Sequence, residues 1–362
     1  MSDQRKLTFI FVFKKSLPKM TCSPLIKKYI KGYSPVIGEY CALCDTQNAV
    51  YYNISCIQRK EYFVSRDWES VFATWSQGPS ATEQERVENA ERQIRQAIQA
   101  SDKLKNRNIK VFTQGSYRNR VNVRRYSDVD VGVLCFDTYF PEYPDDNVKM
   151  ELAKSFVPAT YEYATFKSEL EEALVARFGK AAVTRGSKAF DIKSNTYRVE
   201  SDVAAFFEHR RYVTATYYLS GVEMIPDDFT PPRVKNWPEQ HYENGVSKNT
   251  STSRRFKRVV RVLKNLSNEM ASKGIQSAKD APSFLIESLV FNASNSCFEY
   301  QSFKPMIRHV LAELFNNTMS QEKCSEWGEV NELKYLFRSS QPWTRESAHQ
   351  FLSDAWDYIG YE

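Results

Sequence analysis

Two acidic side chains inside an apolar strand constrain this chain more than any other feature of its sequence. In residues 128–133, Asp128 and Asp130 alternate with valines, which is the pattern of a strand with one apolar face. Because successive side chains of a strand point to opposite sides, the two carboxylates share a face. A strand predicted over residues 109–113 precedes them and ends in a turn at Gly115-Ser116.

These residue types favour phosphate chemistry. Two short carboxylates on one face can share a pair of Mg²⁺ ions, with Mn²⁺ as a substitute, because hard cations prefer oxygen ligands. Gly115 lets the backbone approach phosphate oxygens without a Cβ clash, and Ser116 adds a hydroxyl beside its own backbone N–H. Together they predict a site that binds a nucleoside triphosphate and two metal ions and transfers a nucleotidyl group to a hydroxyl.

A third carboxylate is needed for the metal ion that activates the attacking hydroxyl. The strand predicted over residues 197–207 offers Glu200 and Asp202 on one face. Asp202 is preferred, since a short side chain holds a metal more rigidly and apolar residues follow it directly; Glu200 is the alternative. Each piece alone is ordinary, because Gly-Ser is usually a turn and an Asp-x-Asp pair is often a solvated face. Their order along the chain, a strand, the Gly-Ser turn, the acid pair and then an acid on a later strand, favours the nucleotide and metal site over these ordinary interpretations.

The residues around this core carry a family resemblance. The strings QGSYRN (114–119), NVR (122–124) and SDVDV (127–131) resemble the polymerase-β-like nucleotidyltransferases and, more narrowly, the bacterial cGAS/DncV-like nucleotidyltransferases of CBASS anti-phage defence. The resemblance runs from about residue 67 to the C-terminus. It implies an α+β fold in which a palm with a mixed sheet and a long flanking helix (67–225) packs against a linker loop and helical lobe (226–362). Residues 1–66 are left as an N-terminal segment of uncertain order.

The resemblance also implies nucleotide contacts beyond the acid pair. Gln114 joins Gly115 and Ser116, and the helical lobe of the family supplies a lysine to the triphosphate and then a Ser-Tyr pair. Lys264 and Ser283-Phe284 stand at these places, and Phe in place of Tyr keeps the stacking ring but loses the hydroxyl. Independently, four cations recur at helical spacing, a pattern that is usually only a solvated face: Arg254, Lys257, Arg261 and Lys264.

Such enzymes join two or three nucleoside triphosphates into a cyclic dinucleotide or trinucleotide, a second messenger that activates a separate effector. The effector is not expected to bind this chain directly, and nucleic acid is not required. One alternative is a transferase acting on RNA or on a small molecule such as an antibiotic. Another is a non-catalytic nucleotide-binding module, which the intact Asp128, Asp130 and Asp202 argue against. The nucleotides used are not readable from these residues.

Composition limits which disulfides, metal ligands, partners and cellular location can be expected. Seven cysteines, an odd number, disfavour a disulfide framework, and Cys41 and Cys44 lack a second pair with zinc-site spacing. Only four histidines occur, which leaves carboxylates as the expected metal ligands. The formal charge of +6 agrees only weakly with a phosphate-bearing partner. No apolar run approaches the ~20 residues of a membrane span, so a cytoplasmic protein with no membrane partner is expected.

Periodicity predicts the other elements. A capping box at Thr82 and Glu85 opens a helix with an apolar stripe from Val87 to Ile98. A second helical region covers 149–178 and ends at Gly179. Residues 189–192 and 197–207 form a hairpin. A proline-containing long loop is predicted over 226–250. Helices then follow from residue 253 and over 282–292, 305–315 and 344–358. The first of these has an apolar stripe at helical spacing: Phe256, Val259, Val260, Leu263 and Leu266.

Overall fold

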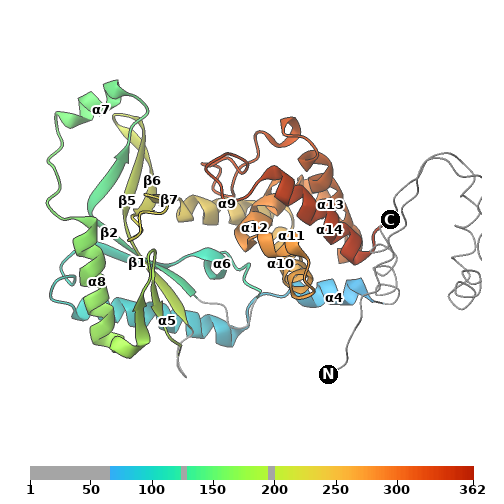
Figure 1. The fold of residues 1–362 in the computed structure, drawn as a ribbon, viewed down its shortest axis with the longest axis horizontal. Coiled ribbons are helices and arrows are strands. Elements are labelled where there is room, and N and C mark those ends of the chain that lie inside the picture. The colour runs from blue at the N-terminus through green and yellow to red at the C-terminus, as the bar shows by residue number, and fades with distance from the viewer. Residues whose placement is uncertain (1–65, 124–128, 195–199) are drawn as a thin grey trace, which may run out of the picture. The chain divides into compact units, whose positions relative to one another are not determined.

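Within residues 66–123, 129–194 and 200–362, which are those that the computed structural model describes, seven strands form one mixed sheet (Figure 1). The described residues all fall in a single unit of the chain, Tyr62–Glu362. The two long central strands, β2 (Val129–Glu142) and β5 (Ser201–Thr214), run parallel, and β1 (Ile109–Thr113) pairs antiparallel with β2. The mixed sheet agrees with the predicted fold class.

The other edge of β5 is shared by two antiparallel partners. β4 (Phe190–Ile192) pairs with its first residues and β6 (Tyr217–Met224) with its last part. The β4–β5 pairing confirms the predicted hairpin, whose turn lies outside the described residues. Two short outer strands complete the sheet, β3 (Val183–Arg185) on β4 and β7 (Val234–Asn236) on β6.

Two long helices pack on the sheet and on each other, α5 (Ala81–Ala100) and α8 (Tyr163–Phe178) (Figure 1). The predicted stripe of α5, from Val87 to Ile98, is buried in the core of this lobe. Its cap differs from the prediction. Ser80 and Glu83, not Thr82 and Glu85, exchange the two capping hydrogen bonds. Both pairs fit the capping pattern, so the sequence alone could not choose between them.

The helical region predicted over 149–178 is divided. α7 (Asp146–Ala153) and α8 are separated by a segment that contains Pro158, and proline is unfavourable in a helix interior. α7 buries none of its residues. Gly179 is the C-terminal cap of α8, as predicted, with a φ of 87° that favours glycine.

The long loop predicted over 226–250 is wrong in its second half. Residues 234–236 form β7, and Pro238–Ser251 forms a helix, α9. Pro238 occupies the first turn of α9, where its missing N–H has no helical partner to lose. This helix was not predicted because it buries only His241 and Gly245, and its sequence therefore has no apolar stripe at helical spacing.

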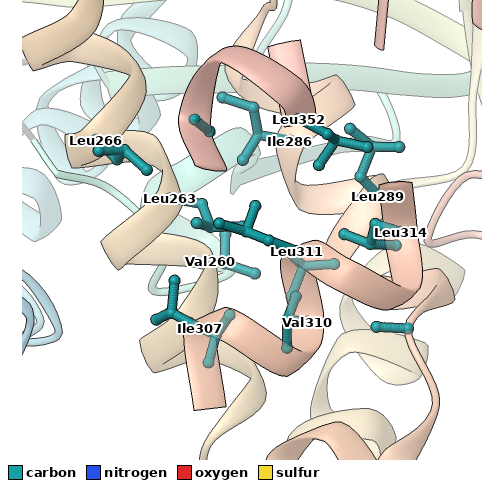
Figure 2. Packing of buried hydrophobic residues seen from close by; sticks show 14 of the residues in the cluster. Val260, Leu263, Leu266, Ile286, Leu289, Ile307, Val310, Leu311, Leu314 and Leu352 are labelled. Carbon is teal, nitrogen blue, oxygen red and sulfur yellow. The ribbon is translucent and has the colours of Figure 1, made fainter. Parts of the chain in front are cut away.

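The helical lobe surrounds α10 (Phe256–Ser272), whose predicted apolar stripe is buried. Figure 2 shows its Val260 and Leu263 near side chains of the neighbouring helices. These neighbours match the predicted helices within a few residues: α12 (Ser283–Asn292), α13 (Phe303–Thr318) and α14 (Arg345–Ile359). A short helix, α11 (Gln276–Asp280), precedes α12.

The first described helix also belongs to this core. The predicted palm range begins at residue 67, yet Trp68 and Phe72 of α4 (Trp68–Trp75) are buried among the side chains of α10 and α13. From residue 66 onward the described part of the chain packs first against the helical lobe, then crosses to the sheet through α5 and returns through α9. No helix of the described residues is long and apolar enough to cross a lipid bilayer.

Candidate active site

A cavity of about 400 Å³ lies where the sheet lobe meets the helical lobe. It brings together residues that are far apart in the sequence, and seven of the predicted site residues line it: Gln114, Gly115, Ser116, Asp130, Lys264, Ser283 and Phe284. Asp202 is not among the lining residues, and Asp128 lies outside the described residues. The cavity is also lined by residues that were not predicted as site residues: Arg118, Asn119, Asn236, Trp237, Pro238, His241, Glu287, Glu329 and Asn331.

Gly115 and Asp130 are in close contact on the sheet side of the cavity. The backbone N–H of Gln114 donates to the carbonyl of Asp130 at 2.8 Å, which fixes the turn between β1 and the short helix α6 (Gly115–Arg118) against β2. Gly115 has a φ of 65°, and a Cβ there would overlap Oδ2 of Asp130 and lie 3.0 Å from its Cγ. The backbone conformation therefore favours glycine, and any other residue here would have to displace the Asp130 carboxylate.

Asp202 stands directly beside Asp130 in the sheet. The two residues are register partners on the parallel strands β2 and β5, so their side chains leave the same face from backbones about 4.8 Å apart. Glu200 precedes β5, is exposed, and accepts a hydrogen bond from the Val129 N–H through its backbone carbonyl at 2.9 Å. This register favours Asp202 over Glu200 as the acid that would act with Asp130.

The described residues contain no group of three His, Cys, Asp or Glu side chains placed to hold a metal ion. One predicted member of such a group, Asp128, lies outside the described residues, and the other two, Asp130 and Asp202, are neighbours on β2 and β5. Cys41 and Cys44 also lie outside the described part. The three cysteines that are described, Cys135, Cys297 and Cys324, are buried free thiols.

A buried carboxylate forms the helical side of the cavity. One oxygen of Glu287 accepts from the ammonium of Lys264 at 3.2 Å, and the other bonds Nε2 of His241 at 3.1 Å. All three side chains are at most 9% exposed. Burial alone would raise the pKa of Glu287, but the Lys264 charge and the His241 contact outweigh it and lower the pKa to about 2. Glu287 is therefore an anion that fixes two cavity-lining side chains.

Sequence reasoning missed Glu287 and His241, though one signal for Glu287 was present. It follows Ser283 by four residues on α12, so the two side chains share a helix face. His241 carried no comparable signal, because α9 was predicted as a loop. The Phe284 ring, which is 37% exposed, lies 5.6 Å from the His241 ring and 6.0 Å from the Trp343 ring.

The cationic stripe of α10 is mostly not a solvated face. Lys257, Arg261 and Lys264 of α10 are buried, whereas Arg254 precedes the helix and is exposed. Arg261 donates to the carbonyls of Ser76 at 2.8 Å and Arg120 at 2.5 Å. Burial and the Arg258 charge lower the pKa of its guanidinium to about 10. Arg261 thus joins α10 to the segments before α5 and after α6, and does not line the cavity.

A second set of charges joins α9 to the sheet lobe. Glu239, at the start of α9, pairs with Arg118 of α6 and with Lys110 of β1, the latter at 2.8 Å. These two cations hold the pKa of Glu239 below its ordinary value against the opposing effect of burial. Arg118 also lies 4.9 Å from the ring of Tyr242. These contacts fix the start of α9, and with it His241, beside the Gly115 turn.

Known proteins match both lobes. Residues 243–360 match the cGAS/DncV-like nucleotidyltransferase C-terminal helical domain. The chain is 42% identical over 301 residues to the cyclic dipyrimidine nucleotide synthase CdnE of Legionella pneumophila, covering 82% of this chain and 99% of that one. It is 35% identical over 294 residues to the enzyme of the same name from Cecembia lonarensis, covering 81% and 98%.

A solved structure agrees with these matches. The CdnE cyclic dinucleotide synthase of Elizabethkingia meningoseptica, with GTP and Apcpp, superposes with a TM-score of 0.68 at 32% identity and covers 81% of this chain and 99% of its own. The expected α+β fold and the family resemblance are thereby confirmed. By these matches the chain, in which Asp130 and the Gly-Ser turn line one cavity with the buried Lys264, belongs to the cGAS/DncV-like nucleotidyltransferases.

Proposed function

We propose that this protein joins two pyrimidine nucleoside triphosphates into a cyclic dipyrimidine nucleotide and releases pyrophosphate. The observation that carries the proposal is the single cavity lined by Ser116 and Asp130 from the sheet lobe and by Lys264 and Ser283 from the helical lobe. The choice of pyrimidines rests on the two cyclic dipyrimidine nucleotide synthases to which the chain is 42% and 35% identical.

The reaction is the same substitution carried out twice. A ribose hydroxyl oxygen attacks the α-phosphorus of a second nucleotide, the bond from that phosphorus to the bridging oxygen breaks, and pyrophosphate leaves. The hydroxyl proton is released. A second round between the two linked nucleotides closes the ring. Pre-alignment of both nucleotides in one cavity would account for much of the rate, because it converts an encounter between molecules into a reaction within a complex.

The cavity residues divide this work between the two lobes. The Gly115 turn lets its backbone come close to phosphate oxygens, and Ser116 adds a hydroxyl donor. Lys264 offers an ammonium group from the opposite wall, where Glu287 holds it in place. Phe284 presents a partly exposed ring on which a base can stack.

Magnesium is part of the proposal. Asp130 and Asp202 fit it, because their carboxylates are short, hard oxygen ligands held side by side on a rigid pair of strands. Asp128 is proposed as the third ligand. When bound, two Mg²⁺ ions, or Mn²⁺ in their place, would stabilise the charge on the phosphate oxygens and lower the pKa of the attacking hydroxyl.

The experiment is to incubate the purified protein with nucleotides alone. All four nucleoside triphosphates would be supplied, one at a time carrying an α-phosphorus label, with Mg²⁺ and no RNA or drug acceptor. Digestion with phosphatase and mass spectrometry would then follow. We expect a phosphatase-resistant product labelled by UTP or CTP. A product labelled only by ATP or GTP would contradict the choice of pyrimidines.

Asp130→Asn is the matched control, because it removes one charge and keeps the size of the side chain. It should abolish the product and leave the fold intact by circular dichroism. Undiminished turnover would refute the metal assignment. Absence of product from the native protein under varied conditions would favour a transferase that needs an RNA or small-molecule acceptor, or a non-catalytic nucleotide-binding module.

In the cell, we propose that the cyclic product serves as a second messenger in anti-phage defence. It would act on a separate effector protein in the cytoplasm and would need no nucleic acid for its synthesis. This part rests on membership of the cGAS/DncV-like family. Loss of phage resistance in cells that carry Asp130→Asn in place of the native protein would support it.

A further inference from the structure

The imidazole of His241 is a group in the cavity that the proposed reaction does not use. His241 is buried on α9 and lines the same cavity as Lys264 and Asp130. Its Nε2 bonds Oε1 of Glu287 at 3.1 Å. Within the described residues no hydrogen bond to its Nδ1 occurs.

Glu287 decides which ring nitrogen carries the proton. The carboxylate is ionised, since its pKa is lowered to about 2, and an ionised carboxylate only accepts hydrogen bonds. Nε2 must therefore be the donor. A neutral ring then leaves Nδ1 as a bare acceptor, whereas a protonated ring presents an Nδ1–H. The neutral ring repels a phosphate oxygen at Nδ1, and the protonated ring binds it.

The local charge balance favours the protonated form once a nucleotide is present. Glu287 carries one negative charge and Lys264 one positive charge, so this buried pair is neutral before the ring is counted. The other charged groups nearby are Asp130 and Glu329, which line the same cavity, Lys257, which lies about two turns before Lys264 on the same face of α10, and Arg118, which is already paired with Glu239. A triphosphate adds several negative charges, and a nearby opposite charge stabilises a protonated imidazole.

We propose that His241 is a triphosphate-binding residue that takes up a proton when the nucleotide binds. Glu287 is its positioning residue and holds it beside Lys264, so that two donors face the phosphates from the helical side. This inference rests on the proposed function, because it requires a nucleoside triphosphate in the cavity. It assigns α9 a direct part in binding, in addition to its part in joining the lobes.

Isothermal titration calorimetry with α,β-imido-UTP and Mg²⁺ tests the proposal. The analogue binds without reacting, and titrations at pH 8 in buffers of low and high ionisation enthalpy give the number of protons exchanged. We expect the native protein to take up about 0.5 to 1 proton per analogue, because the proton bound at Nδ1 is taken from the buffer. We expect His241→Gln to take up none. This substitution keeps an N–H near the Nε2 position but cannot be protonated.

The quantity to compare is the difference in proton uptake between the native protein and His241→Gln, because the phosphates of the analogue titrate equally in both. Affinity of the native protein should rise at least about 10-fold from pH 8.5 to 6.5 relative to His241→Gln, because uptake of half a proton or more over two pH units changes the binding constant by that factor. His309→Gln is the matched control. His309 is exposed on α13 and stacked on Tyr300, 4.4 Å between ring centroids, and it does not line the cavity.

Each outcome is decisive. Proton uptake in the native protein and in His309→Gln, and its loss in His241→Gln, supports the inference. Binding of the analogue by the native protein with no proton uptake overturns it while leaving the proposed function standing, and this measurement does not depend on any variant folding. Failure of the native protein to bind any nucleoside triphosphate analogue would instead count against the proposed function itself.

Discussion

Replacement of Glu287 by Gln should destabilise the protein, because it removes one charge from a buried pair and leaves the other. The Lys264 side chain is 3% exposed, and Glu287 is its anionic partner at 3.2 Å. An uncompensated buried ammonium costs about 3–5 kcal/mol. The lowering of the Glu287 pKa from 4.5 to about 2 corresponds to roughly 3 kcal/mol, which agrees with the lower end of that range.

Urea unfolding of both proteins, followed by tryptophan fluorescence and circular dichroism, measures this difference. The Glu287 pKa is lower in the folded chain, so its charge stabilises the fold above pH 4.5, and the contribution is lost as the pH falls towards 2. The difference in free energy of unfolding between native protein and Glu287→Gln should therefore be constant at neutral pH and shrink below pH 4.5.

Two further variants make the measurement specific. Glu243→Gln makes the same chemical change at an exposed position of α9 and should change the free energy of unfolding by less than about 0.5 kcal/mol. The double variant Glu287→Gln with Lys264→Met should be more stable than Glu287→Gln alone, because no unpaired charge stays buried. A Glu287→Gln protein within about 0.5 kcal/mol of the native one at pH 7 would refute the reasoning.

Three other predictions concern the acid pair and the turn beside it. Gly115→Ala should lower turnover at least ~100-fold, because its Cβ would displace the Asp130 carboxylate. It should also lower the free energy of unfolding by about 1–2 kcal/mol, because alanine is strained in the left-handed backbone conformation. Initial-rate assays and urea unfolding measure the two effects, and normal turnover would exclude the close contact. Asp202→Asn should abolish product formation while Glu200→Gln retains most of it, as judged by radiolabel assays; the reverse ranking would make Glu200 the third acid. Removal of divalent cations with EDTA should stop the reaction, and Mg²⁺ or Mn²⁺ should restore it; turnover that persists in EDTA would contradict metal dependence.

Much of the sheet side of the site could be predicted from sequence because its determinants are local. Asp130 lies on a strand whose alternation is visible in the residues around it, and Gly115 lies at a turn that ends the preceding strand. Strand alternation fixes which side chains share a face before any tertiary contact forms. The register of β2 and β5, which places Asp202 beside Asp130, depends on pairing between distant segments and was not readable.

The helical side was decided by the tertiary structure. Lys264 was proposed from family resemblance, but its spacing alone was equally compatible with a solvated face. Its burial, the Glu287 carboxylate that holds it, and the contribution of His241 depend on how α9, α10 and α12 pack around one point. Burying a charged side chain costs free energy, which contacts with partner groups offset. Here those partners come from other helices that are distant in the sequence, so the sequence alone does not show which charged residues can be buried.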